Sequence, residues 1–478
     1  MPRNSEKLSQ PIIIYGAGQA GRETAAYLTQ NKKFNVLGFI DDDKRIKHFN
    51  ILGYKVIGNI KKIKKIKKDF PNLIVLMAII DLSPKERIKI ISLLEKFEVH
   101  VKTIPKNYGA LETKLSIEDI SLNDLIDRDT SKPKKELLKK NISKKSVLIT
   151  GAGGSIGSEL SEQVANLNPS ELILVDSSEF NLYNLRKKFE SYKTLSSIKF
   201  ILRDIRNKDE LRKIFTEYKI DTIYHAAAYK HVPLLQEKEN FFAAIDNNFF
   251  STFEMCKLSV EYNISNLVLI SSDKAVNPPN LMGASKRLAE LSLQAFQLKR
   301  ESKTTFSIVR FGNVINSSGS VIPLFWEQIS SGGPITVTHK DVNRYFMTIT
   351  EAASLVIQAS AMSSGGEVFL LDMGSPIRIK ELAEKMIRLS GNSVADFGED
   401  NGIGIVYSGL RPGEKLNEEL LLSNNPKDTD HPKIKKGIEK NFNLEEIISL
   451  KNNLEKSLRE NNFKESKKII SFYVDGYI

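Results

Sequence analysis

SVLITGAGGSIGSELSEQVANLNPSELILVD, residues 146–176, decides the fold of the larger part of this chain. An apolar strand at residues 147–150 runs into a glycine-rich turn, a helix follows, and a second apolar strand ends at Asp176. This order is typical of a Rossmann unit, in which the N–H groups at the start of the helix bind a pyrophosphate. The stretch therefore predicts an α/β domain with a parallel sheet.

Residues that follow the predicted strands of this domain are our candidates for cofactor binding. The glycines permit a tight turn and a close approach to a phosphate. An acid at the end of the second strand suits the adenosine ribose diol and repels a 2′-phosphate, which favours NAD over NADP. The candidates are Gly151, Gly154, Ser155, Ile156, Gly157, Asp176, Asp204, Ile205, Ala226, Ala227 and Lys286.

Length and composition limit the class of protein. A chain of 478 residues exceeds one ordinary core, so we expect more than one domain. The single cysteine, Cys256, lies in an apolar helical run, which excludes a disulfide framework and indicates a buried, unreactive thiol. No apolar run is long enough to span a bilayer, and the first ten residues lack the apolar core of a signal peptide. We therefore expect a soluble, cytoplasmic protein.

The net charge of +12 does not indicate a nucleic acid partner. The lysines concentrate in residues 61–68 and 132–145 and are not interleaved with aromatic residues. In the first run, Ile63 and Ile66 stand three apart, which predicts a short helix with a basic outer face. We interpret both runs as solvated faces, with attraction to an anionic membrane surface as the alternative.

A second glycine turn occurs in PIIIYGAGQAGRETAAYL, residues 11–28. Gly16, Gly18 and Gly21 fit the G-x-G-x-x-G pattern, and the next predicted strand ends at Asp41. Further strands are predicted at residues 73–80 and 99–104. Because this domain is short for a complete dinucleotide-binding sheet, two alternatives stay open: it binds a nucleotide or sugar nucleotide, or it only packs beside the second domain.

SSDKAVNPPNLMGASK, residues 271–286, is where we expect the chemistry. It follows the apolar strand NLVLI, and residues at the carboxyl end of a parallel strand face the ligand crevice. Ser272, Asp273 and Lys274 should therefore point at a substrate. Met282 and Lys286 stand one helical turn apart, the spacing of the Tyr-x-x-x-Lys pair of short-chain dehydrogenases with the tyrosine missing. For this stretch alone, a solvated turn is the alternative.

Longer stretches resemble one family. They are HAAAYKHVPLLQ (225–236), VRFGNVINSSGSVIPLFWEQISSGGPITVTH (309–339), NRYFMTITEAASLVIQA (343–359), GLRPGEKLNEELL (409–421) and the stretch just described. Together they are similar to polysaccharide-biosynthesis nucleotide-sugar 4,6-dehydratases, which are extended short-chain dehydrogenase/reductases. The resemblance runs from about residue 11 to 435. It implies two Rossmann-like parallel-sheet domains in tandem, the second with a small C-terminal substrate-binding lobe.

The resemblance also implies an activity. It predicts a hydro-lyase that uses NAD to convert UDP-N-acetylglucosamine to a UDP-4-keto-6-deoxy-N-acetylhexosamine for surface polysaccharide or glycoprotein sugars. Members that invert C5 carry tyrosine where this chain has Met282, so the methionine implies a configuration-retaining member. The longer relatives usually begin with membrane-spanning helices, whereas this chain begins directly at its first glycine turn.

The implied chemistry assigns a role to each residue of the central stretch. Asp273 is the expected acid for the departing C6 hydroxyl, which requires a raised pKa. Lys274 is the expected C5 base, which requires a pKa lowered by burial and by the nearby Lys286. Ser272 is expected to hydrogen-bond the C4 oxygen, and Lys286 to hold the nicotinamide ribose. Met282 carries no proton, so the C4 proton should pass through Ser272 to Asp273 or Lys274.

Substrate contacts are expected mainly from the C-terminal lobe. The planar fork of arginine suits a diphosphate, although a domain-closing salt bridge is the alternative for Arg344 and Arg411. His225 and His231 lack partner ligands at metal spacing, so we interpret them as structural or substrate-contacting and expect no metal site. The substrate-binding candidates are Lys230, Asn313, Ser317, Arg344, Arg411 and Glu414.

The predicted organisation is a tail (1–10), a Rossmann-like domain (11–107), a linker (108–145), a dehydratase domain with its substrate lobe (146–440) and a C-terminal helical segment (441–478). The last segment has amphipathic helical spacing suited to packing or oligomerisation, and we expect a homo-oligomer. Association with a membrane surface or a glycan-assembly complex stays open. The rival activities are a nucleotide-sugar C4-epimerase and a catalytically silent nucleotide-sugar-binding scaffold.

Overall fold

The computed structural model describes residues 9–30, 33–104, 117–121, 124–125, 132–190, 197–299, 302–315, 317, 320–396, 402–419, 426–437, 439 and 441–477. The chain forms two compact units, each assembled from segments that are separate in the sequence. The first unit combines residues 1–129, 319–341 and 378–409, and the second combines 130–318, 342–377 and 410–478. The expected boundaries after residues 107, 145 and 440 stay predictions. Most of the expected tail and much of the expected linker lie outside the described residues.

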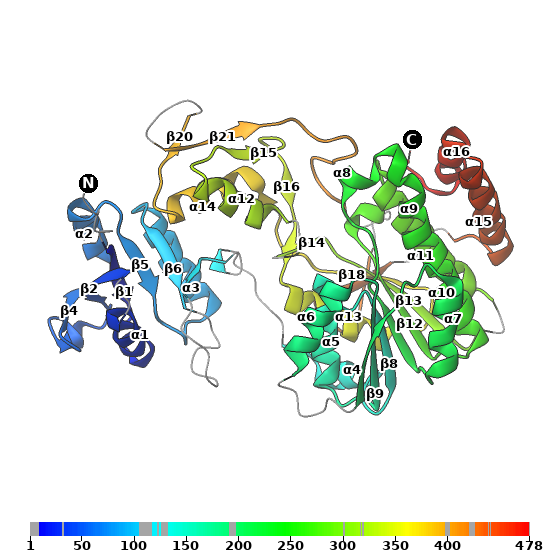
Figure 1. The fold of residues 1–478 in the computed structure, drawn as a ribbon, viewed down its shortest axis with the longest axis horizontal. Helices are drawn as coiled ribbons and strands as arrows, with labels where there is room; N and C mark the ends of the chain where they lie inside the picture. The colour runs from blue at the N-terminus through cyan, green and yellow to red at the C-terminus, as the bar shows by residue number, and fades with distance from the viewer. Residues whose placement is uncertain are drawn as a thin grey trace, which may run out of the picture. The chain divides into compact units, whose positions relative to one another are not determined.

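A mainly parallel sheet forms the core of the first unit (Figure 1). Its order is β3-β4-β2-β1-β5-β6-β7, in which β4, β2, β1, β5 and β6 run parallel and the two edge strands are antiparallel. This is the 3-2-1-4-5 order of a Rossmann sheet. The elements are β1 (Gln10–Tyr15), α1 (Gln19–Gln30), β2 (Phe34–Ile40), β3 (Asn50–Ile51), β4 (Tyr54–Gly58), α2 (Ile63–Asp69), β5 (Ile74–Met77), α3 (Pro84–Glu95), β6 (His100–Thr103) and β7 (Glu118–Asp119).

The predicted short helix of the first lysine run is confirmed as α2, where Ile63 is fully buried. Lys67 turns inward and donates to the carbonyls of Phe97 (2.9 Å) and Glu98 (2.6 Å), which lie just beyond the end of α3. Lys64 and Lys68 of the same helix are exposed. The basic run therefore includes one lysine that ties two segments together.

Two later segments pack with this sheet and complete the first unit. They contain α12 (Val321–Ser330), β15 (Ile335–Val337), α14 (Ile379–Leu389), β20 (Val394–Ala395) and β21 (Ile403–Tyr407). Arg388 of α14 pairs with Glu95 of α3 at 3.0 Å, and Ser393 donates to Glu98 at 3.0 Å. Residues expected to belong to the substrate lobe of the second domain thus pack against the N-terminal sheet.

A nine-stranded sheet organises the second unit, in the order β10-β9-β8-β11-β12-β13-β18-β23-β22. The strands from β10 to β18 are parallel, and β23 and β22 are antiparallel. The order reverses between β8 and β11, the point where doubly wound sheets bind ligands. The strands of this sheet are β8 (Ser146–Thr150), β9 (Glu171–Asp176), β10 (Ile198–Leu202), β11 (Thr222–His225), β12 (Asn266–Ile270), β13 (Thr305–Arg310), β18 (Val368–Leu371), β22 (Lys427–Asp428) and β23 (Ile434–Gly437). The short strands β14 (Asn313–Val314), β16 (Asn343–Arg344) and β17 (Phe346–Met347) lie outside it, and β14 pairs with β17.

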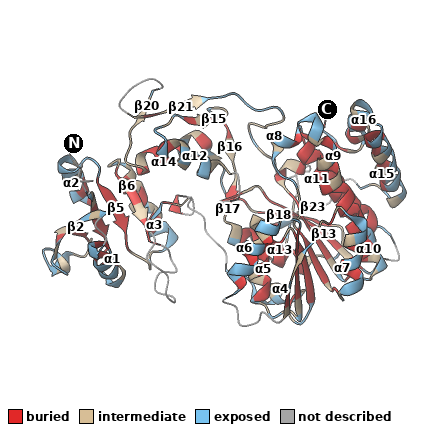
Figure 2. Cartoon of the chain, in the orientation of Figure 1, coloured by how far each residue is buried: buried red, intermediate tan, exposed pale blue. Residues whose placement is uncertain are grey.

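Helices cover both faces of this sheet (Figure 1). One face carries a hydrophobic cluster with α5 and α13, and the other carries a cluster with α7, α10 and α11. Figure 2 shows α11 buried along most of its length. The helices are α4 (Lys135–Lys139), α5 (Ser155–Ala165), α6 (Glu179–Phe189), α7 (Lys208–Glu217), α8 (Val232–Leu235), α9 (Phe241–Ile245), α10 (Ser251–Glu261), α11 (Leu281–Gln297), α13 (Ile349–Met362), α15 (Leu444–Arg459) and α16 (Phe463–Tyr473).

The predicted terminal amphipathic helix is confirmed as α15, followed by α16. Asn443 caps α15 through a reciprocal bond with Glu446, and the apolar face of the helix is buried in the same cluster as α11. This packing is intramolecular. Cys256, also in this cluster, is fully buried as predicted, and burial raises the pKa of its thiol well above the usual value.

A buried group of four charges joins three segments of the second unit. Arg310 on β13 is fully buried and pairs with Glu290 of α11 at 2.5 Å and with Glu439 at 2.5 Å. Arg287 contacts the same two carboxylates, at 3.0 and 2.8 Å. Ser271, at the end of β12, donates to Glu290 at 2.6 Å. The network therefore lies directly beneath the stretch where the chemistry was predicted.

Replacing Glu290 by glutamine should strongly destabilise the protein, because two arginines would then share one buried carboxylate. Breaking a buried pair in this way costs about 3–5 kcal/mol of unfolding free energy. Urea unfolding of Glu290→Gln measures the loss. Glu261→Gln, which removes the solvent-exposed partner of Arg212, is the control and should change stability far less. Equal effects of the two substitutions would contradict this account.

Candidate active site

Ser272, Asp273 and Lys274 lie where strand pairing places them. β12 ends at Ile270, but its pairing with the neighbouring chain continues, since Ser271 N donates to Val309 O (2.8 Å) and Asp273 N donates to Phe311 O (3.1 Å). A short turn then begins, capped by Ser272 Oγ, which accepts from Lys274 N at 3.2 Å. The predicted strand is confirmed, and the three side chains stand at its carboxyl end.

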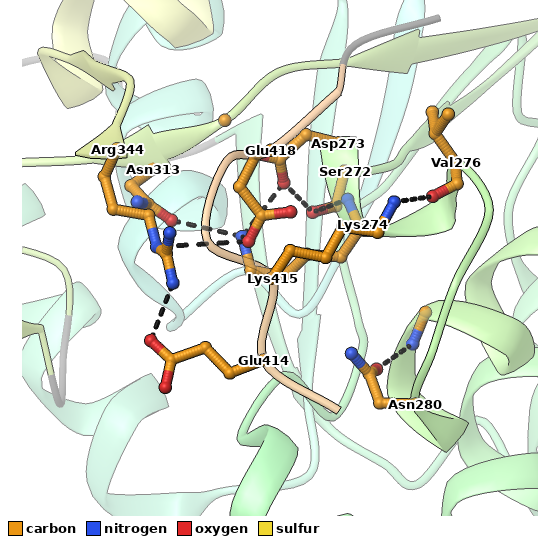
Figure 3. A network of polar contacts seen from close by, with 12 residues as sticks. Ser272, Asp273, Lys274, Val276, Asn280, Asn313, Arg344, Glu414, Lys415 and Glu418 are labelled. Carbon is orange, nitrogen blue, oxygen red and sulfur yellow. Dashed lines mark hydrogen bonds and ion pairs between the residues drawn. The ribbon is translucent and has the colours of Figure 1, made fainter. Parts of the chain in front are cut away.

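The carboxylate of Asp273 has two unlike oxygens (Figure 3). Oδ1 accepts from Ser272 Oγ at 2.8 Å and from Lys274 Nζ at 3.0 Å. Among the described residues, none donates to the buried Oδ2. A side chain at Gly312 would bring its Cβ within 3.1 Å of Oδ2, so glycine keeps that side open. One oxygen is held in place, and the other is available to a proton or a ligand.

The ammonium of Lys274 lies between acceptors from three segments (Figure 3). Besides Asp273, it reaches Asn313 Oδ1 at 3.2 Å and Glu418 Oε1 at 3.6 Å. Burial by itself lowers the pKa of this ammonium, but the carboxylates of Asp273 and Glu418 outweigh it and raise the pKa above its ordinary value. The expectation of a lowered pKa for Lys274 is therefore wrong, because two carboxylates surround it.

Lys286 is the lysine with the depressed pKa. Its side chain is buried on α11 and donates to Ile270 O at 2.7 Å. Burial lowers the pKa to about 8, while Glu290 one turn later opposes the shift. Lys286 and Lys274 thus have opposite electrostatic environments on the two sides of the same loop.

Met282 is almost fully buried in the hydrophobic cluster beneath α11. Asn280 caps the helix by accepting from Gly283 N at 2.8 Å. A Cβ on Gly283 would lie 2.0 Å from Lys274 O, so only glycine allows the helix to start against the turn at residues 273–275. Helix α11 is therefore held tightly to the loop that carries Asp273 and Lys274.

The predicted glycine turn is confirmed between β8 and α5. Gly151 has φ +64°, and a Cβ there would lie 2.6 Å from Ala227 N, so the turn rests directly on the segment after β11. A Cβ on Gly157 would lie 2.0 Å from Gly151 O. Ser155 and Ile156 open α5, and Ala226 is half-buried beside Ala227.

The acids after β9 and β10 have different surroundings. Asp176 accepts from Gly153 N (2.9 Å) and Ser178 N (2.8 Å), which fixes its carboxylate against the glycine turn. Asp204 is paired with Arg206, whose hydrogen bond lowers the pKa of the acid. Ile205 is buried in the core cluster. Asp176 thus lies at the end of β9 beside the glycine turn, as predicted. The carboxylate of Asp204 instead forms an ion pair with Arg206.

The substrate candidates fall into two groups. Asn313 and Arg344 join the cluster around Lys274, since Arg344 lies 4.0 Å from Glu418. Arg344 also pairs with Glu414 at 2.6 Å, an ion pair within the second unit. Lys230 and Arg411 are exposed, and Ser317 is half-buried between residues outside the described part of the chain.

Sequence reasoning missed Glu418. Its side chain is 7% exposed and lies between Lys274 and Arg344. Burial, with the negative charge of Asp273, raises its pKa despite the neighbouring cations. The only signal in the sequence was the pair of adjacent acids, Glu418 and Glu419, just after GLRPGEK.

His225 belongs to a buried polar chain. Its Nδ1 is 2.7 Å from Thr150 Oγ1, and its Nε2 is 2.9 Å from Thr252 Oγ1. Burial, with the charge of Lys286, lowers the pKa of the imidazole to about 3, so the ring is neutral. This geometry fits the structural interpretation of His225, while His231 is exposed.

The N-terminal glycine turn repeats the geometry of the second unit. Gly16 has φ +107°, and a Cβ on Gly21 would lie 1.9 Å from Gly16 O. Asp41 accepts from Ala17 N at 2.8 Å, as Asp176 does from Gly153 N. Gly18 has open space where its Cβ would be. Whether this turn holds a nucleotide stays a prediction.

Comparison with known proteins identifies the family. The family described as "Polysaccharide biosynthesis protein" matches residues 147–439, well over half of the chain. The chain belongs to this family. A second match, to the PglD N-terminal domain, covers residues 11–92. These matches confirm the resemblance to the nucleotide-sugar dehydratases of polysaccharide biosynthesis.

Individual proteins with similar sequences support the same family. The capsular polysaccharide biosynthesis protein CapD of Staphylococcus aureus is 40% identical over 86% of this chain and 68% of its own length. An inverting UDP-N-acetylglucosamine 4,6-dehydratase of Campylobacter jejuni is 28% identical over 59% of this chain and 78% of its own. The X-ray structure of Pen from Bacillus thuringiensis matches with a TM-score of 0.56 and 34% identity, over 63% of this chain and 91% of Pen.

Among the described residues, the helices are too short or too polar to cross a membrane.

The depressed pKa of Lys286 predicts a pH dependence of stability. Between its folded pKa of about 8 and its unfolded value of 10.5, the unfolded chain binds more protons, so stability should rise with pH. Relative to Lys286→Met, the wild type should gain about 2 kcal/mol of unfolding free energy between roughly pH 7 and pH 9.5. Urea unfolding of both proteins at the two pH values tests this. A difference that does not change with pH would show that Lys286 is not a buried cation.

Proposed function

We propose that this protein is an NAD-dependent 4,6-dehydratase of UDP-N-acetylglucosamine that retains the configuration at C5. One observation carries the proposal: Ser272, Asp273 and Lys274 form a hydrogen-bonded cluster at the carboxyl end of a parallel strand. A hydroxyl, a carboxylate and an ammonium are the groups that an internal redox and elimination cycle requires. The Campylobacter relative is named for the same sugar, with inversion.

The residues of the second Rossmann unit fit NAD. The N-cap residue of α5 is Gly154, which has no side chain to cap the helix, and a helix N-terminus is suited to a phosphate. A Cβ on Gly154 would approach only Gly151 O, at 3.2 Å, which leaves the outer side of the turn open. Asp176 would hold the ribose diol, and Lys286 the nicotinamide ribose. When bound, NAD would accept a hydride from C4 of the sugar and return it to C6.

The hydrogen bonds around Asp273 provide a route for the C4 proton. A sugar hydroxyl that donates to Ser272 Oγ can release its proton through this hydroxyl to the carboxylate 2.8 Å away. Asp273 then donates the same proton to the C6 hydroxyl, which leaves as water. A single carboxylate therefore takes a proton at C4 and gives it back at C6. No tyrosine is needed where Met282 stands.

A C4-epimerase is the nearest rival. It shares the fold and the chemistry at C4 but needs no acid for a leaving hydroxyl, and enzymes of that type normally depend on the tyrosine that Met282 replaces. The buried position of Met282 in the core, beside an intact Asp273–Lys274 cluster, favours the dehydratase. An intact cluster also argues against a catalytically silent scaffold.

The direct test is incubation with UDP-N-acetylglucosamine and NAD in deuterated water, followed by NMR of the sugar. A 4-keto-6-deoxy product with deuterium at C5 and unchanged configuration is the expected result. Inversion at C5 would support the dehydratase activity but would show that Met282 does not mark a configuration-retaining enzyme. Formation of UDP-N-acetylgalactosamine alone would establish the epimerase, and no turnover of several UDP-sugars would favour the scaffold.

Asp273→Asn should abolish most of the turnover, because the amide cannot carry the proton from C4 to C6. The expected loss in kcat is about 10²–10⁴-fold, the usual contribution of a positioned acid. Asp209→Asn, at the exposed start of α7, is the control and should keep wild-type kcat. Wild-type turnover by Asp273→Asn would remove this residue from the mechanism.

A further inference from the structure

We propose that Glu418 accepts the proton of Lys274, so that Lys274 can take the proton from C5 of the sugar. The proposal rests on the dehydratase function given above and names the base of its elimination step. The motivating geometry is the position of the Glu418 carboxylate, 3.6 Å from Lys274 Nζ and 4.0 Å from Arg344 Nε (Figure 3).

The elimination needs a neutral amine where the structure holds an ammonium. Lys274 is paired with Asp273 at 3.0 Å, and an amine with a raised pKa keeps its proton. Asp273 cannot accept the ammonium proton of Lys274, because Asp273 already carries the C4 proton at this stage of the cycle. A second acceptor must lie within reach of Nζ. Among the described residues, Glu418 is the other carboxylate that contacts Nζ.

The contacts of the cluster favour a proton on Glu418. Lys274 and Arg344 contact Glu418 only at 3.6 and 4.0 Å, whereas Arg344 pairs with Glu414 at 2.6 Å. Lys415 is a third cation that acts on Glu418. Burial nevertheless raises the pKa of Glu418, whose carboxylate has the longest ion-pair distances of the cluster and is therefore the one best able to take a proton from Lys274.

The protons of the step balance. Lys274 transfers its ammonium proton to Glu418, and the neutral amine then removes the C5 proton as the C6–O bond breaks and protonated Asp273 donates to the leaving hydroxyl. When the hydride returns to C6, Lys274 gives a proton back to C5, and Glu418 returns its own to Lys274. No proton is gained or lost by the pair over the cycle.

The test separates oxidation at C4 from exchange at C5. Glu418→Gln keeps the size and hydrogen-bonding capacity of the side chain but cannot take a proton. Stopped-flow absorbance of reduced nicotinamide reports C4 oxidation, and NMR in deuterated water reports C5 exchange. We expect C4 oxidation at a rate close to that of the wild type, with C5 exchange and product formation lowered by about 10²-fold or more.

Glu419→Gln is the matched control. Glu419 is the next residue, its side chain is 52% exposed, and it pairs with Lys415 at 3.3 Å, away from Lys274. This variant should retain both rates. Glu418→Asp keeps a carboxylate on a shorter side chain and should recover part of the C5 exchange, which distinguishes a lost proton acceptor from a disturbed fold.

Several outcomes would overturn the proposal. Wild-type C5 exchange in Glu418→Gln, an equal loss of C4 oxidation and C5 exchange, or no recovery in Glu418→Asp would each do so. If the wild-type protein itself formed no 4-keto-6-deoxy sugar, the dehydratase function would fail first, and that result is read from the wild type alone.

Discussion

The buried pairing of Arg310 with Glu290 and Glu439 is the constraint on which the active site depends. An arginine with no exposed surface is tolerated only when its charge and donors are matched, and here two carboxylates do so. Because the carboxylates come from α11 and from the segment after β23, the pairing fixes both against β13. Glu290 also accepts from Ser271, the residue before Ser272. The position of the reactive groups therefore follows from an electrostatic balance beneath them.

The two lysines of the central stretch show how the same side chain acquires opposite properties. Lys286 donates to a carbonyl in a buried setting, and its pKa is lowered. Lys274 faces two carboxylates, and its pKa is raised. The difference arises from the acceptors that each ammonium meets, since both are largely removed from water. Two lysines whose pKa values are shifted in opposite directions can take different parts in proton transfer, as the proposed function requires.

Much of the fold could be predicted from local sequence patterns. Features that depend on contacts between distant residues could not. The strand, turn and helix around Gly151 could be predicted because glycine geometry and apolar periodicity are local properties, and the same holds for Asp176 and for α15. The pKa direction of Lys274 was predicted wrongly because it depends on how the carboxylate of Asp273 folds onto the ammonium and on Glu418, which a distant loop brings to it. Arg206 stands only two residues after Asp204, but only the folded geometry shows that the two pair. The association of residues 378–409 with the N-terminal sheet likewise has no local signal.

The interleaved arrangement of the two units has a consequence for biosynthesis. The chain passes from one unit to the other at residues 129/130, 318/319, 341/342, 377/378 and 409/410. Neither unit can be separated from the other by a single cut, because each would lose segments that belong to it. During translation, β6 and α3 cannot make their contacts with α14 until α14 has left the ribosome. The hydrophobic cluster of the N-terminal sheet consists of residues between Ile12 and Ile104, so this core is complete in sequence long before the segments that finish the unit are made.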